Sequence, residues 1–80
     1  MKTILILGAN GRIGFALSDF FLKNNFKIIA VDKDLKRFKG KKISDLVKIK
    51  IDLSSDKNIK KLVKKISKEK DIDGIIYSLY

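Results

Sequence analysis

Apolar residues in this 80-residue chain fall into short runs and spaced stripes that alternate along its length. Residues 3–7 form an unbroken run of threonine, isoleucine and leucine that ends at Gly8, which is typical of a strand buried on both faces of a parallel sheet. Asn24-Asn25 predicts the end of a following helix, because asparagine tolerates the left-handed backbone conformation. The three- and four-residue spacing that predicts this helix is found at Ile13, Ala16, Leu17, Phe20 and Phe21.

The middle of the chain repeats this alternation. A second apolar run at 26–31 predicts a strand that closes where the polarity changes at Asp32, and the basic stretch 35–42 predicts a short helix or a loop. Residues 47–51 alternate between apolar residues and lysine, as in a strand with one solvated face near a sheet edge. Residues 54–56 offer N-cap side chains for a second long helix, whose apolar stripe is Ile59, Leu62, Val63 and Ile66.

The lysines of this second helix predict a solvated face opposite the stripe, and a fourth strand is predicted at 75–79. The order strand, helix, strand, short helix, strand, helix, strand implies parallel strands joined by right-handed crossovers. The expected fold is therefore α/β: an open, Rossmann-like parallel sheet of about four strands in the order 3-2-1-4, with helices on both faces. Residues 1–80 make one domain, half of a Rossmann fold plus one strand.

Composition narrows the classes of function. The net charge of +10 would suit phosphate binding, but the excess is nearly all lysine in a chain rich in isoleucine and asparagine, a profile typical of an AT-rich genome. We therefore do not expect nucleic acid as a partner. The absence of cysteine and histidine excludes a thiol nucleophile and an ordinary zinc site, and no metal is expected. The early apolar run is too short to span a bilayer, so we expect a cytoplasmic protein.

The segment between the first strand and the first helix carries three glycines at regular spacing. In this context Gly8 would allow the sharp exit from the strand, Gly11 the close approach of a pyrophosphate, and Gly14 the close packing of helix on sheet. Free amides at the helix start would attract phosphate. The alternative is a structural turn without a ligand. The residues expected to bind the cofactor here are Gly8, Asn10, Gly11, Arg12, Ile13 and Gly14.

Asp32 stands at the end of the second strand, close to the spacing of about 20 residues expected for the carboxylate that accepts the ribose hydroxyls. A carboxylate there would repel a 2′-phosphate, which favours NAD over NADP. The neighbouring Lys33, also expected at the site, and Arg37 could partly neutralise such a phosphate, so NADP stays an alternative. Otherwise Asp32 is a turn residue at a strand end.

These motifs resemble the short-chain dehydrogenase/reductase superfamily over nearly the whole chain. The Gly-x-x-Gly-x-x-Gly spacing at 8–14 is nearer that of its extended and atypical branches, such as NAD-dependent sugar-nucleotide epimerases and dehydratases. Asp52-Leu53-Ser54 resembles the motif whose carboxylate lies against the adenine amino group. The resemblance implies this role for Asp52, with Leu53 packing on the ring.

The approach to the fourth strand is also similar to the superfamily, which normally continues into a small-residue turn. Here the chain reads Tyr77-Ser78-Leu79-Tyr80, and Ser78 or Tyr77 is the candidate for the nicotinamide side. The catalytic Tyr-x-x-x-Lys of the superfamily has no counterpart, because neither tyrosine is followed by a lysine four residues on. We interpret both tyrosines as strand-end packing and expect no catalytic residue in this chain.

The leading hypothesis is the N-terminal, NAD-preferring part of a larger oxidoreductase or epimerase, inactive by itself, whose small-molecule substrate would bind only in the full-length protein. One alternative is a non-catalytic dinucleotide sensor or interaction module. A malate/lactate-type dehydrogenase is a weaker one, because the Asp52-Leu53-Ser54 motif fits it less well. The unpaired edge of the last strand also predicts self-association.

Overall fold

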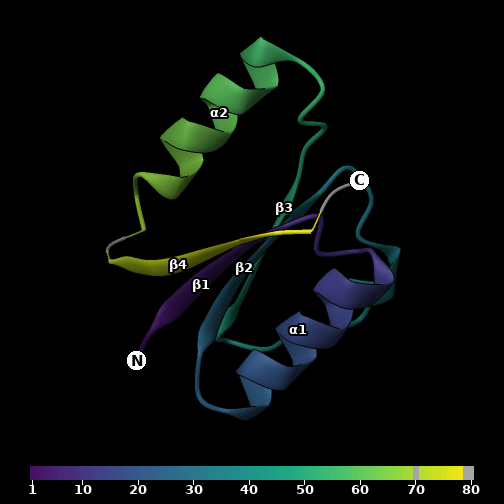
Figure 1. Cartoon of the computed structure of the whole chain (residues 1–80), viewed down its shortest axis with the longest axis vertical. Helices are drawn as coiled ribbons and strands as arrows, with labels where there is room; N and C mark the ends of the chain where they lie inside the picture. The colour runs from purple at the N-terminus through teal and green to yellow at the C-terminus, as the bar shows by residue number, and fades with distance from the viewer. Residues whose placement is uncertain (70, 79–80) are drawn as a thin grey trace.

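The computed structural model describes residues 1–69 and 71–78. Four strands and two long helices alternate in it, with a short 3-10 helix between the second and third strands (Figure 1). In chain order the elements are β1 (Thr3–Leu7), α1 (Arg12–Lys23), β2 (Lys27–Asp32), η1 (Lys36–Phe38), β3 (Leu46–Lys50), α2 (Asp56–Ile66) and β4 (Ile72–Tyr77).

All four strands run parallel in one sheet of order β3-β2-β1-β4, which confirms the predicted order and class. Figure 1 shows α1 and α2 on opposite faces of this sheet, with the strands between them. The carboxyl ends of parallel strands meet at one edge of the sheet, so the loops that leave β1, β2 and β3 and the end of β4 lie at this edge.

The two central strands form the core, and alternate side chains serve opposite faces. Ile6 and Ile28 lie in the cluster beneath α1, whereas Leu5 and Ile29 lie in the cluster beneath α2. All four are almost completely buried. Because both faces are covered, the strands need apolar residues at every position, which explains the unbroken runs in the sequence.

Helix α1 lies on the sheet with its smallest residues. Gly14 and Ser18 are its buried positions, and the Ser18 hydroxyl donates to the Gly14 carbonyl oxygen at 2.8 Å. Its end is as predicted, because Asn25 has a φ of 63°. Part of the predicted apolar stripe does not belong to the hydrophobic core, because Ile13 and Phe20 are 56% and 57% exposed. The stripe identified the helix correctly, but the small residues beside it face the sheet.

Helix α2 begins as the capping residues predicted. The Ser55 hydroxyl accepts from the Asn58 backbone N–H at 3.2 Å. Leu62 is the buried residue of its stripe, whereas Ile59 and Val63 are exposed. The lysines that were predicted to form a solvated face are all exposed, namely Lys57, Lys60, Lys61, Lys64, Lys65 and Lys68.

Two strands are displaced by one residue from the predicted runs. Phe26 belongs to the turn before β2, because its N–H donates to the Phe21 carbonyl oxygen at 3.0 Å and its ring packs on that of Phe21. β3 begins at Leu46, which pairs with Ile28, and ends before Ile51. The basic stretch between them contains η1, and its Phe38 is buried against the ring of Phe15.

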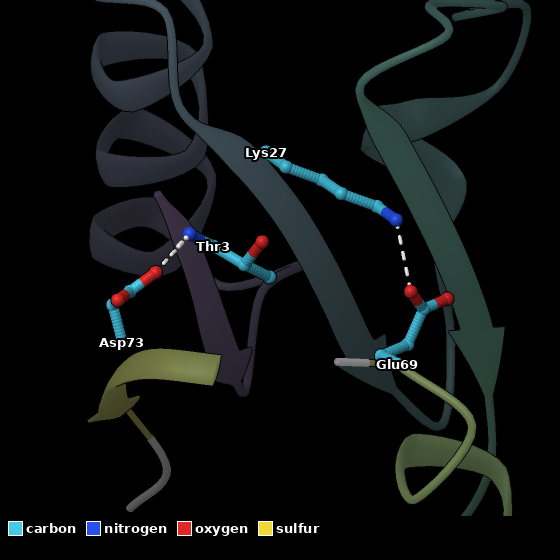
Figure 2. A network of polar contacts seen from close by, with 4 residues as sticks. All are labelled: Thr3, Lys27, Glu69 and Asp73. Atoms are coloured by element: carbon cyan, nitrogen blue, oxygen red, sulfur yellow. Dashed lines mark hydrogen bonds and ion pairs between the residues drawn. The ribbon is translucent and has the colours of Figure 1, made fainter. Parts of the chain in front are cut away.

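The fourth strand begins three residues earlier than predicted, at Ile72. The predicted run left Asp73 and Gly74 outside the strand. In the structure the Asp73 carboxylate accepts from the Thr3 N–H at 2.8 Å, beside an irregularity in the pairing of β1 with β4 (Figure 2). The strand ends at Tyr77. The predicted extension to Leu79 and the packing of Tyr80 lie outside the described residues. No helix within 1–69 and 71–78 has the length and apolarity to cross a membrane.

Candidate functional site

The glycine turn leaves β1 at the carboxyl edge of the sheet. Gly8 has a φ of 84°, a conformation that residues with a Cβ rarely adopt. Its N–H and that of Ala9 both donate to the Val31 carbonyl oxygen, at 2.9 and 3.1 Å. The turn is therefore attached to the end of β2, the strand that carries Asp32.

Helix α1 starts at this turn without a side-chain cap. Gly11 is its N-cap residue, and the first bond of the helical ladder runs from the Phe15 N–H to the Gly11 carbonyl oxygen at 2.9 Å. The amides of Arg12, Ile13 and Gly14 precede that bond, so they have no partner in the helix ladder and can bind an anion. Helix α2 differs, because a serine caps its first turn.

Two glycines of the turn meet different surroundings. A Cβ on Gly14 would overlap the Gly8 carbonyl oxygen and lie 2.9 Å from Ala9 Cα, so α1 can approach β1 only with glycine there. This agrees with the packing role predicted for Gly14. A Cβ on Gly11 would meet only the Gly8 oxygen, at 3.5 Å, which is an ordinary contact. The fold itself does not require glycine at 11, and the close approach of a pyrophosphate there stays a prediction.

The Asp32 carboxylate is oriented by two backbone amides. Asn10 N–H donates to Oδ2 at 3.0 Å, and Lys33 N–H donates to Oδ1 at 2.7 Å. Each oxygen keeps a second lone pair for another donor. Such fixed carboxylates suit sugar hydroxyls, which can donate to both oxygens at once.

Asp52 follows β3 at the same edge of the sheet. Its Oδ1 accepts from the Ser54 N–H at 2.9 Å, and its carbonyl oxygen accepts from the Asn58 side chain at 2.8 Å. The Ser54 amide lowers the pKa of Asp52 below its ordinary value, and the Ser54 hydroxyl and the positive charge of Lys33 act in the same direction. The carboxylate is therefore ionised at neutral pH and available to an amino group.

A cleft of about 640 Å³ joins these groups, a volume within the range of ordinary ligand sites. It brings together seven of the predicted site residues: Gly8, Gly11, Asp32, Lys33, Asp52, Leu53 and Ser78. Tyr77, also considered for the nicotinamide side, lines it too. Residues from all four strand ends and from α2 thus share one cavity.

Four predicted site residues do not line this cleft. Asn10 is bonded to the Asp32 carboxylate through its N–H, and Gly14 packs against the backbone of Gly8 and Ala9. Arg12 and Ile13 instead line a second hollow on the outer side of α1, together with Ala16, Leu17 and Phe20. Only the backbone amides of Arg12 and Ile13 would serve an anion at the helix start.

The sequence also missed part of the lining. Leu7 is the last residue of β1 and Val31 the residue before Asp32 in β2, and both line the cleft. Ile59 and Leu62 line it from α2. Ile59 and Leu62 were predicted only as part of a helix stripe. The signal that could have found them is that α2 begins just after the Asp52 motif, so that its apolar stripe starts beside the carboxyl edge.

A parallel sheet of this order, with a glycine turn after its first strand, defines a Rossmann-type NAD-binding domain. Residues 4–78 match the NAD dependent epimerase/dehydratase family, and the chain belongs to this family.

Among solved structures, the chain is similar to 4-hydroxyisoleucine dehydrogenase complexed with NADH, with 35% sequence identity and a TM-score of 0.76. The match covers 89% of this chain and 30% of that one, so the present chain spans less than a third of that dehydrogenase. A search of curated proteins found no match.

Proposed function

We propose that this chain is the NAD(H)-binding part of a larger oxidoreductase or epimerase/dehydratase. The observation that carries the proposal is the common cleft of the glycine turn and Asp32, whose carboxylate is held toward the turn by the Asn10 amide. The pyrophosphate binds at the amides of the α1 start, and the adenosine ribose donates to Asp32. Family membership and the NADH-bound relative support this assignment.

The strand order indicates which end of the cofactor lies over which side of the sheet. Asp52 and Leu53 follow β3 on one side of the glycine turn, and Tyr77, the last residue of β4, and Ser78 lie on the other. The adenine therefore lies on the β3 side, with its amino group at the ionised Asp52 and its ring on Leu53. The nicotinamide lies toward Ser78, whose N–H is bound to the Leu7 carbonyl oxygen at 2.8 Å.

The charge at the ribose favours NAD over NADP. A 2′-phosphate would stand beside the Asp32 carboxylate, and like charges at that distance repel. Lys33 and Arg37 follow closely and reduce the repulsion without removing the carboxylate. We expect NADPH to bind more weakly than NADH. The difference between the two affinities should decrease at high salt, because salt screens the charges.

In the superfamily the nicotinamide carries the hydride, and a tyrosine and a lysine on a later segment handle the proton. No tyrosine in these 80 residues is followed by a lysine four positions on. We therefore propose that the 80 residues bind the cofactor without turnover, and that substrate specificity belongs to the larger protein.

The test is a titration of the chain with NADH and NADPH, followed by NADH fluorescence and calorimetry. The sharpest variant is Gly11→Ala, because the backbone there (φ −68°, ψ 168°) suits alanine and the added methyl meets only one ordinary contact. It should fold normally and bind NADH at least tenfold more weakly, since the methyl occupies the expected pyrophosphate position.

Gly40→Ala is the matched control, because Gly40 has a φ of 80° and open space around it, and it does not line the cleft. That variant should lose about 1 kcal/mol of stability and keep its NADH affinity. A chain without saturable NADH binding would refute the proposal, as would a Gly11→Ala variant that binds as tightly as the unaltered chain.

A further inference from the structure

Three segments meet at one asparagine beside the cleft. The Asn10 N–H donates to Asp32 Oδ2 at 3.0 Å, and the Asn10 side-chain oxygen accepts from the Arg37 N–H at 2.8 Å. Asn10 itself is half-buried. The glycine turn, the end of β2 and η1 are thus joined through one residue, although Asn10 and Arg37 are 27 positions apart.

We propose that Asn10 is a positioning residue, which sets the separation between the pyrophosphate turn and the ribose carboxylate. This inference rests on the proposed function and deepens it. Asn10 does not line the cleft. Its side chain is bonded to the Arg37 N–H and its backbone N–H to Asp32, so it acts on these neighbours rather than on the cofactor.

The physical reason is the covalent spacing of the ligand. Pyrophosphate and adenosine ribose are joined, so both can be bound at full strength only when the turn and Asp32 stand at the matching separation. A site that already has this separation loses less entropy on binding. The bond from the Arg37 N–H to the Asn10 side chain holds the segment after β2 against the turn. Asp32, the last residue of β2, is bonded to the Asn10 N–H of the same turn.

The residue type fits this role. An asparagine supplies a neutral acceptor to the Arg37 N–H. An aspartate would offer an oxygen at the same place, but its charge would stand beside Asp32 and the incoming pyrophosphate and repel both. A small apolar residue would leave the Arg37 amide without this acceptor.

The experiment compares three ligands on the unaltered chain and on Asn10→Ala: adenosine, ADP and NADH. Adenosine carries the ribose but no phosphate, so it can contact Asp32 without the glycine turn. ADP and NADH carry both the ribose and the pyrophosphate, so they contact both. Asn10→Ala keeps the backbone bond to Asp32 and removes the bond between the turn and the Arg37 N–H. Its loss should weaken the binding of ADP and NADH by roughly three- to tenfold and leave adenosine binding unchanged. A role in general stability would weaken all three alike.

Two variants serve as controls. Asn24→Ala removes an exposed asparagine bond of similar kind, from Asn24 Nδ2 to the Phe20 carbonyl oxygen at 2.7 Å, far along α1 from the turn. It should leave all three affinities unchanged. Arg37→Ala keeps the backbone N–H that Asn10 accepts, so hydrogen exchange at residue 37 should stay slow in Arg37→Ala and accelerate in Asn10→Ala.

The outcomes separate the two proposals. An unaltered chain that binds no NADH overturns the proposed function and this inference with it. An unaltered chain that binds NADH while Asn10→Ala binds NADH and ADP equally well overturns this inference alone. Equal weakening of adenosine, ADP and NADH in Asn10→Ala also overturns it.

Discussion

At Gly14 the backbone of α1 comes so close to that of Gly8 and Ala9 that no Cβ fits between them. At Gly8 the need is conformational, because φ is 84°. At Gly11 neither need exists, since the backbone is extended and the space beside it is open toward the cleft. One spaced motif therefore combines a turn, a packing contact and an open position beside the cleft.

Gly14→Ala should be the most damaging substitution in the turn. Its methyl group would meet rigid backbone, so α1 must shift, and overpacking of this kind costs about 1–3 kcal/mol of unfolding free energy. Urea denaturation followed by circular dichroism measures the loss. Gly11→Ala is the matched control, and its unfolding free energy should lie within about 0.5 kcal/mol of that of the unaltered chain. Equal stability of the two variants would contradict the assigned roles.

Asp52 should titrate below its ordinary pKa of 3.8, because the Ser54 amide, then the Ser54 hydroxyl and Lys33, favour the ionised form. The lowered pKa adds stability that is present above about pH 4 and lost as the pH falls through the folded-state pKa. Carbon NMR of the carboxyl group measures this titration. Ser54→Ala should raise the pKa partway, since the backbone donor remains. An unchanged pKa would exclude the hydroxyl as a contributor.

At the scale of elements, polar contacts join Glu69, which follows α2, and Asp73, in β4, to the first residues of β2 and β1, at the edge of the sheet away from the cleft. Figure 2 shows Lys27 at the start of β2 bound to Glu69, with 2.8 Å between Nζ and Oε2, and Asp73 bound to the Thr3 backbone. The Lys27 and Glu69 side chains are 31% and 27% exposed. These contacts hold the end of α2 near the strands, where few apolar side chains of the helix are buried.

Lys27 and Glu69 should show a coupling of about 0.5–1 kcal/mol, because their partial burial limits screening by water. A double-mutant cycle with Lys27→Met and Glu69→Gln measures it by urea denaturation. The exposed Asp19–Lys23 pair, four residues apart on α1, provides the comparison and should couple by about 0.3 kcal/mol. Coupling between Lys27 and Glu69 no larger than in this surface pair would contradict a fastening role.

At the scale of the whole molecule, the two outer strands differ in what their edges present. β3 carries Lys48 and Lys50, and edge lysines discourage pairing between sheets. β4 carries Ile75 and Tyr77, which are 65% and 69% exposed. Within the described part of the chain no strand pairs with the outer side of β4, which faces the viewer in Figure 1. β4 is therefore the edge expected to associate.

The isolated chain should form dimers through β4 as its concentration rises. Each copy carries a net charge of +10, so repulsion opposes the contact and added salt should strengthen it. Sedimentation at several concentrations measures the association. Ile75→Lys should reduce it strongly. Ile43→Lys adds the same charge before β3, at the far side of the sheet, and should have less effect. A chain that stays monomeric at high concentration would contradict this prediction.

Local patterns were sufficient for most of the fold. Strands buried on both faces require unbroken apolar runs, so the runs at 3–7 and 26–31 located the central strands. Strand order followed from the crossovers. The predicted start of β4 was wrong, because aspartate and glycine at 73 and 74 are residue types common in turns. The strand begins earlier because Ile72 pairs with Thr3 and Gly74 pairs with Ile4 of β1, contacts between positions far apart in the chain.

The sequence by itself determined the elements, their order and the two motifs at the carboxyl edge, because these depend on periodicity and on residue type at short range. Tertiary structure decided which face of α1 lies on the sheet, since Gly14 and Ser18 permit a closer approach than Ile13 or Phe20. It also joined Asn10 to Asp32 and Arg37. Contacts between distant positions depend on how packed elements align, which no local pattern records.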